Sequence, residues 1–199
     1  MEIKPEDVKR LREKTGVGMM DCKKALTEAN GDFEEAQAIL RKKGIAVAAK
    51  RADRIASEGL IYAYIHGGGR IGVLIEVNCE TDFVARTEKF QDLAKNLAMQ
   101  VAASKPRWVT PEDAPADAIA RERDILIEQA KNEGKPQDIA EKMVEGRMKK
   151  FYTEYCLVNQ PYIRDEAITV QDVINDFAGQ VGEKVAVRRF VRYALGEEI

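Results

Sequence analysis

The chain has few of the residues that build most catalytic and metal centres. Its 199 residues include one histidine, His66, and three cysteines. A single histidine excludes a His-rich metal site and argues against a Ser-His-Asp or Cys-His arrangement. The cysteines, Cys22, Cys79 and Cys156, are odd in number and far apart, so they form neither a metal-ligand spacing nor a disulfide framework. Cysteines used in this way favour a reducing, intracellular setting.

Several familiar signatures are missing as well. No apolar run approaches the length of a membrane span, and a helical pattern follows Met1 so closely that no signal or transit peptide is expected. No P-loop, dinucleotide fingerprint or nucleophile elbow occurs, and the glycine run at 67–69 precedes no helix that could cradle a phosphate. We therefore expect a cytoplasmic binding protein and not an enzyme, with no cofactor, no bound metal and no membrane contact.

The charge balance is slightly acidic. A net charge of −2 argues against nucleic acid as the main partner. One local exception is the stretch 41–54 (RKKGIAVAAKRADR), which holds six basic residues and one acid. Such a run is usually a solvated linker face, and the alternative is a surface for an acidic protein or a phosphate backbone.

The first 45 residues predict three short helices. The first begins at Pro5, where proline has no N–H to lose and the two acids that follow suit the positive end of a helix. The second begins at about Met19 or Met20 and ends at Ala29, and the third follows an Asp-led capping box and ends at Gly44. A bundle this small has a thin core and usually exists to present a surface.

The rest of the chain predicts an α+β core over residues 56–199, joined to the helices by a basic linker at 46–55. Residues 60–66 and 70–77 are rich in β-branched and aromatic residues, and the glycines between them permit a hairpin turn. The closing segment 184–193 has the pattern of a strand. We expect it to pair with the hairpin in a three-stranded antiparallel sheet, covered by helices on one face.

The core helices are predicted from apolar residues at helical spacing. The first covers 88–103, and a loop with three prolines follows it. Further helices are expected over 116–132 and 137–157, and a short one over 169–177 is expected to be capped by Gly179.

The most informative stretch is 78–84 (NCETDFV), where a strongly apolar strand breaks off ahead of a helix. At such a junction Asp82 and Phe83 could project outward. In the alternative, Thr81 or Asp82 is a helix N-cap and Phe83 belongs to the core. The residues of this segment leave both interpretations open.

Four segments carry a resemblance to a known family. They are residues 11–26 (LREKTGVGMMDCKKAL), 78–85 (NCETDFVA), 155–162 (YCLVNQPY) and 187–193 (VRRFVRY). In order and in sequence they resemble the translation elongation factor Ts family, over nearly the whole chain. The resemblance implies a guanine nucleotide exchange factor for elongation factor Tu, which it would meet in GDP-bound and nucleotide-free forms.

The resemblance also implies site residues. The N-terminal domain, residues 1–45, would have a ubiquitin-associated-like fold that docks on the nucleotide-binding domain of the partner. Its implied contacts are Arg12, Met19 and Met20. The core would insert a segment near the magnesium site of the partner. That segment is Thr81, Asp82, Phe83 and Val84, in which Phe83 is the wedge, Asp82 makes polar contacts, and the other two hold the shape of the turn.

The chain is similar in length to the short forms of this family. Longer members carry a second core subdomain and a coiled-coil protrusion, whereas the corresponding stretch here, about 104–150, is short and helical. The contacts of the second subdomain would then come from a second copy, so we predict a homodimer through the core domain that binds two partner molecules. The resemblance implies a bacterial cytoplasm or an organelle stroma, and no direct contact with nucleic acid.

Other functions remain open at this point. A ubiquitin-associated-like adaptor would form stable complexes without affecting nucleotide release. An RNA-associated protein would use the basic stretch 41–54 with Tyr62 and Tyr64, and its binding would depend steeply on salt. An enzyme ranks last, because no set of reacting groups is visible.

Overall fold

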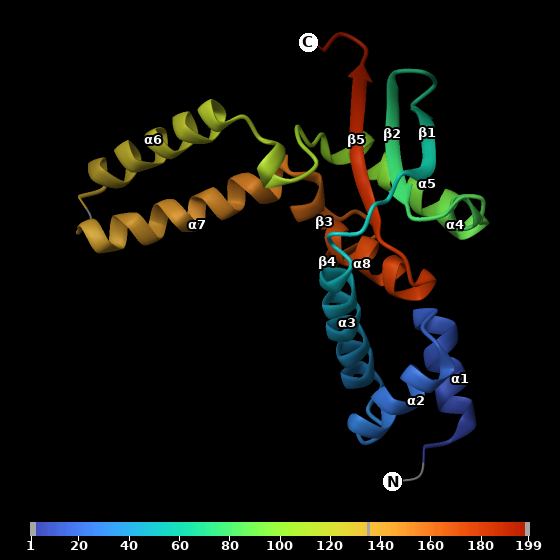
Figure 1. Cartoon of the computed structure of the whole chain (residues 1–199). Helices are drawn as coiled ribbons and strands as arrows, with labels where there is room; N and C mark the ends of the chain where they lie inside the picture. Colours follow the sequence, from blue (N-terminus) through green and yellow to red (C-terminus); the bar gives the residue numbers. More distant parts are fainter. Residues whose placement is uncertain (1–2, 135, 198–199) are drawn as a thin grey trace. The chain divides into compact units, whose positions relative to one another are not determined.

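The computed structural model describes residues 3–134 and 136–197. The chain forms two compact units, each made of segments that are distant in the sequence. The first unit contains the chain up to Leu60, together with Asn78–Phe90 and Asp172–Ala186. The second contains Ile61–Val77, Gln91–Gln171 and the chain from Val187 onward. Figure 1 shows the elements along the chain.

The first unit begins with three helices, α1 (Pro5–Thr15), α2 (Met19–Glu28) and α3 (Phe33–Lys50). Proline at its start favours α1, and Gly16 ends it in a left-handed conformation at φ +68°. One buried cluster joins the three helices: Val8, Leu11, Cys22, Ala25, Leu26, Ala29, Ala36, Ile39 and Leu40. The prediction of three N-terminal helices is confirmed.

Two predicted helix ends are wrong, for the same reason. Helix α3 continues through Gly44 to its end at Lys50, and α8 (Val170–Val181) continues through Gly179. A Cβ atom at Gly179 would lie 3.7 Å from the Cα atom of Gly44. The two glycines therefore lie where α3 and α8 contact each other, at a distance that would also admit a Cβ atom, and they do not stop either helix. The division at residues 45 and 55 stays a prediction, and α3 passes through the first of these positions.

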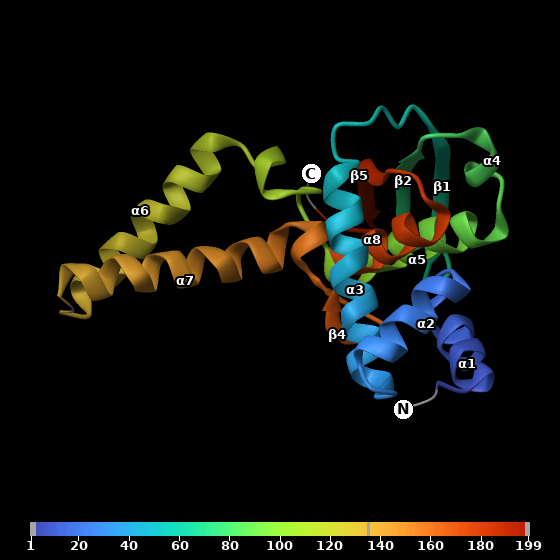
Figure 2. The same cartoon turned by 60° about the horizontal axis from the view of Figure 1, so that its bottom comes forward.

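A three-stranded antiparallel sheet has the order β1 (Glu58–His66), β2 (Ile71–Cys79) and β5 (Val185–Ala194). Helix α5 (Glu88–Ser104) lies across one face of the sheet (Figures 1 and 2). In β2 the alternate residues Val73, Ile75 and Val77 are buried, as expected for a sheet with one covered face. The α+β class and the pairing of the closing strand with the hairpin are confirmed.

The second unit also contains a helical hairpin made of α6 (Ala116–Asn132) and α7 (Gln137–Tyr155). The two helices lie side by side in both views (Figures 1 and 2). Their shared core is small: Leu126, Ala130, Val144 and Met148. This hairpin occupies the stretch that was expected to be short and helical.

Five short elements complete the described chain. Helix α4 (Asp82–Ala85) is a single turn between the sheet and α5. Two 3-10 turns, η1 (Pro111–Asp113) and η2 (Leu157–Asn159), flank the helical hairpin. A small antiparallel pair, β3 (Pro161–Tyr162) and β4 (Asp165–Thr169), precedes α8 and was not predicted. In the described part of the chain, no helix is long and apolar enough to cross a membrane.

Candidate functional site

The segment after β2 forms a tight turn that leads into α4. Thr81 is the N-cap of this helix, and its Oγ1 accepts a hydrogen bond of 3.4 Å from the backbone N–H of Val84. The capping interpretation is therefore correct for Thr81, but Phe83 is not a core residue. Its side chain is 81% exposed. The ring is therefore accessible to another molecule.

The helix buries only one of its own residues, which explains why Phe83 points outward. Ala85 packs inward, Val84 is half-buried, and a single turn has no room for a second buried face. Asp82 lies 2.9 Å from Arg86 in an ion pair between neighbouring turns. Both partners are well exposed to solvent, so the pair contributes little to stability and Asp82 can exchange it for another contact.

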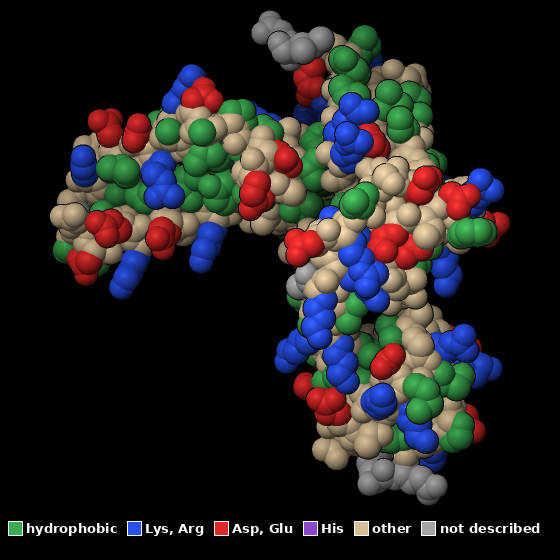
Figure 3. Space-filling model, in the orientation of Figure 1, with side chains coloured by type: hydrophobic (Ala, Val, Ile, Leu, Met, Phe, Trp, Pro, Cys, Tyr) green, Lys and Arg blue, Asp and Glu red, His purple; other side chains and the backbone are tan. Residues whose placement is uncertain are grey.

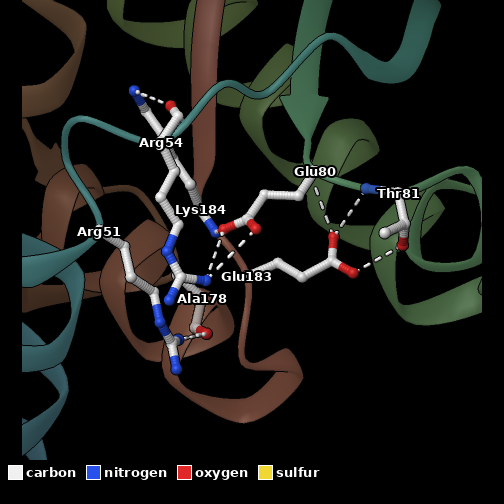
Figure 4. A network of polar contacts seen from close by, with 7 residues as sticks. All are labelled: Arg51, Arg54, Glu80, Thr81, Ala178, Glu183 and Lys184. Atoms are coloured by element: carbon white, nitrogen blue, oxygen red, sulfur yellow. Dashed lines mark hydrogen bonds and ion pairs between the residues drawn. The ribbon is translucent and has the colours of Figure 1, made fainter.

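Glu183, from the loop between α8 and β5, holds the start of the turn (Figure 4). Its Oε2 accepts hydrogen bonds from the backbone N–H groups of Glu80, at 3.1 Å, and Thr81, at 3.0 Å. Its Oε1 accepts a third from the Thr81 hydroxyl at 2.6 Å. Both carboxylate oxygens are thus used by two consecutive residues, which fixes the direction in which the chain enters α4.

A second carboxylate makes the converse contact. Glu80 Oε1 accepts a hydrogen bond of 2.6 Å from the backbone N–H of Lys184, and Arg54 Nη1 lies 3.3 Å from its other oxygen. The hydrogen bond from Lys184 and the charge of Arg54 hold the pKa of the Glu80 carboxyl below its usual value. The Lys184 ammonium donates to the carbonyl of Arg54 (Figure 4) and to that of Ala52, so the turn after α3 joins the same network.

Cys79 lies beneath the turn and is fully buried. Its thiol donates a hydrogen bond of 3.1 Å to the carbonyl of Thr81. Burial, with the negative charge of Glu183 as the next cause, raises the pKa of this thiol to about 11. The group is therefore a neutral donor at physiological pH and supports the turn from inside.

The predicted docking residues lie on the N-terminal helices of the same unit. Arg12 is exposed on α1, and Met19 and Met20 are exposed in the first turn of α2. Hydrophobic side chains lie among Lys and Arg side chains over α1 and α2 in Figure 3. Methionine side chains are flexible and polarisable, which suits them to a protein contact surface.

The family model described as "Elongation factor TS" matches residues 6–197. A relative named "Elongation factor Ts" from Moorella thermoacetica is 65% identical over 99% of this chain and 97% of that protein. The chain belongs to the elongation factor Ts family. Relatives of the same name from Desulforamulus reducens and Carboxydothermus hydrogenoformans are 62% and 58% identical, over 98% of this chain and 90% of each of those proteins.

Within this elongation factor Ts chain, the structure adds residues that sequence reasoning missed. Glu183, Lys184 and Arg54 carry the polar network but were not among the predicted site residues. The acidic and basic residues after Gly182 were a weak signal, because charged residues after a helix are common on any surface. No group of three or more His, Cys, Asp or Glu that could hold a metal occurs among residues 3–134 and 136–197.

Proposed function

We propose that this chain promotes the release of GDP from elongation factor Tu during translation elongation. Membership in the elongation factor Ts family supports this role in general. The observation that carries the finer proposal is the exposed Phe83 on a turn whose backbone is fixed from two sides. In this mechanism the segment Thr81–Val84 inserts next to the magnesium site of the partner, and Phe83 acts as the wedge.

The physical basis is the electrostatic interaction that holds the nucleotide on the partner. Mg²⁺ bridges the phosphates of a bound nucleotide to the protein, so displacing its ligands or waters weakens GDP binding. Burying one Phe side chain supplies roughly 1.5–3 kcal/mol toward that deformation. Asp82 would exchange its ion pair with Arg86 for polar contacts on the partner. No covalent bond is made or broken, so the chain would not be an enzyme in the chemical sense.

Thermodynamic linkage sets a requirement for such a factor. It must weaken GDP binding by the same ratio by which GDP weakens its own binding. The factor therefore holds the nucleotide-free partner tightly and the GDP-bound partner poorly. Arg12, Met19 and Met20 would provide contacts that do not depend on the nucleotide, as docking residues on the partner's nucleotide-binding domain. The N-terminal helices would act as a ubiquitin-associated-like docking module.

The basic stretch 41–54 favours a structural role over RNA binding. Four of its six basic side chains have partners within the first unit. They are Arg41 with Asp172, Lys43 with Glu28, Arg51 with the carbonyl of Ala178, and Arg54 with Glu80. Side chains engaged in this way are poorly placed to bind a phosphate backbone. We infer that the chain makes no direct contact with nucleic acid.

We also propose that the chain forms a homodimer through the sheet of its second unit. The apolar side chains Ile61, Ile65, Leu74, Val191 and Tyr193 are exposed on β1, β2 and β5. Leu74 alternates with buried residues of β2, so it lies on the face of the sheet that α5 does not cover. Hydrophobic side chains gather over these strands in Figure 3. A second copy would bury this face and present a second exchange segment to a second partner.

We infer a bacterial cytoplasm as the site of action, since the relatives come from bacteria. The proposed function is tested by loading elongation factor Tu with a fluorescent GDP and chasing it with excess unlabelled nucleotide. Catalytic amounts of this chain should accelerate the loss of fluorescence. A complex that forms without any acceleration would instead indicate an adaptor.

A further inference from the structure

We infer that Glu183 is a positioning residue, which holds the Thr81–Val84 segment in the conformation that presents Phe83. This inference rests on the proposed exchange function. Glu183 lies 102 residues after Thr81 in the sequence, and the fold brings the two side chains into contact.

The first support is the way in which Glu183 uses its two oxygens. One oxygen accepts both backbone N–H groups at 80 and 81, and the other accepts the Thr81 hydroxyl. A hydroxyl has a single hydrogen, so the Thr81 oxygen donates to Glu183 and keeps its lone pairs for the Val84 N–H. The helix cap and the contact with Glu183 therefore depend on one hydroxyl orientation.

The second support is reciprocity. The Glu183 side chain binds the backbone at 80–81, and the Glu80 side chain binds the backbone N–H of Lys184. Two carboxylates thus close a ring between the two segments, as Figure 4 shows. Lys184 extends this ring to the carbonyls of Ala52 and Arg54. A turn whose first residues are held by two reciprocal contacts cannot swing as an isolated loop could.

The consequence is preorganisation. When the turn is already ordered in the free protein, the cost of ordering it does not fall on the step that inserts Phe83. Removing the Glu183 carboxylate moves the ordering of roughly one backbone residue into that step, so we expect the maximal exchange rate to fall about tenfold. Initial docking through Met19 and Met20 uses other residues and should be unaffected.

The experiment measures GDP release as a function of factor concentration for wild type, Glu183→Ala and Glu183→Gln. Glutamine keeps one acceptor oxygen for the two N–H groups and an NH₂ that can donate to the Thr81 hydroxyl. Glu183→Gln should therefore retain most of the maximal rate, while Glu183→Ala loses about tenfold at an unchanged half-saturating concentration. A variant that merely unfolds would show the opposite pattern, a higher apparent half-saturation with the same maximum.

A double variant and amide hydrogen exchange distinguish the positioning role of Glu183 from other effects on the exchange rate. In the Phe83→Ala background, Glu183→Ala should cost little more, because it acts through the same turn. Amide hydrogen exchange of free Glu183→Ala should speed up at residues 80, 81 and 84, with no change in α5. Full activity of Glu183→Ala beside an active wild type would overturn the role of Glu183 alone. An inactive wild type with faster amide exchange in Glu183→Ala would overturn the proposed function and leave the structural contact intact.

Discussion

The Oε1 atom of Glu80 lies 2.6 Å from the backbone nitrogen of Lys184, a residue 104 positions later in the chain. This hydrogen bond and the nearby Arg54 guanidinium favour the ionised carboxyl and lower its pKa. At the junction between the turn before α4 and the start of β5, where Glu183 makes the converse contact, Glu80 is therefore a charged group that stabilises the fold. Its protonation state links the stability of this junction to pH.

Acid should weaken the fold through Glu80. A carboxyl whose pKa is lower in the folded than in the unfolded chain stabilises the fold above its unfolded pKa. The stabilisation by Glu80 is therefore complete above pH 4.5, the ordinary pKa of this carboxyl. It disappears as the pH falls through the lower pKa of the group in the folded protein. Glu80→Gln should destabilise the protein near neutral pH, and the difference from wild type should shrink in acid. Urea unfolding at a series of pH values measures this.

The matched control is Glu128→Gln, at an exposed position on α6. It should leave the unfolding midpoint unchanged near neutral pH. A Glu80→Gln effect that stayed constant from neutral pH into strong acid would contradict the account of the carboxylate.

The buried thiols should be unreactive in the native protein. Burial raises the pKa of both Cys79 and Cys156 to about 11, so almost no thiolate is present near neutral pH. A chromogenic disulfide reagent should label both slowly until the protein unfolds. Above pH 9.0, the ordinary pKa of a cysteine thiol, the unfolded chain loses the thiol protons before the folded one does. The free energy of unfolding should therefore fall as the pH rises toward 11. Rapid labelling of Cys79 in the folded protein, located by peptide mass, would contradict this.

A buried glutamine pair should be essential to the second unit. Gln100 on α5 is fully buried; its amide donates to Gln160 Oε1 at 3.1 Å and its oxygen accepts from the N–H of Ile163 at 2.8 Å. Gln100→Leu leaves the oxygen of the buried Gln160 without this hydrogen bond and removes the acceptor of the Ile163 N–H, so we expect a loss of about 1–3 kcal/mol in the free energy of unfolding. Gln91→Leu, at an exposed position of the same helix, is the control and should have little effect. Equal stabilities of the two variants would show that the network is dispensable.

Local sequence patterns were sufficient for most of the elements. The helix over 116–132 follows from its apolar spacing after a proline, and the hairpin follows from β-branched residues around the glycines at 67–69. The same local rules failed at Gly44 and Gly179, because a glycine that lies in a contact between two helices need not end either of them. That choice depends on a neighbour more than a hundred residues away.

The residues of the candidate site could likewise be predicted only where the signal is local. The segment itself predicted a helix cap at Thr81 or Asp82 and left the exposure of Phe83 open, and the proposed roles of these residues came from the family resemblance. Glu183 could not be found in this way, because its function depends on a contact formed only when the chain has folded. A carboxylate that binds two backbone N–H groups has no local sequence signature.

The proposed dimer makes a prediction about the sheet. Leu74→Glu places a charge in the centre of the exposed apolar face and should convert a dimer into a monomer, because an unpaired charge is costly to bury. Ile139→Glu, at an exposed position on α7, is the matched control and should remain dimeric. Sedimentation equilibrium at several concentrations distinguishes the two. A wild type that sediments as a fully active monomer would contradict the dimer.

Phe83→Ala tests whether the Phe83 ring acts as the wedge. The ring is 81% exposed, so its removal should leave the thermal midpoint nearly unchanged. If the ring is buried in the partner, its loss removes roughly 1.5–3 kcal/mol from the exchange step, a fall of about 10- to 100-fold in rate. Ile55→Ala, at an 84% exposed position in the same unit, is the control for the loss of an exposed apolar side chain.

The most direct measurement is the release of fluorescent GDP from elongation factor Tu with wild type, Phe83→Ala and Ile55→Ala at equal concentrations. The account predicts fast release with wild type and Ile55→Ala, and slow release with a fully folded Phe83→Ala. Equal acceleration by wild type and Phe83→Ala would contradict the wedge, and no acceleration by wild type would contradict the exchange function itself.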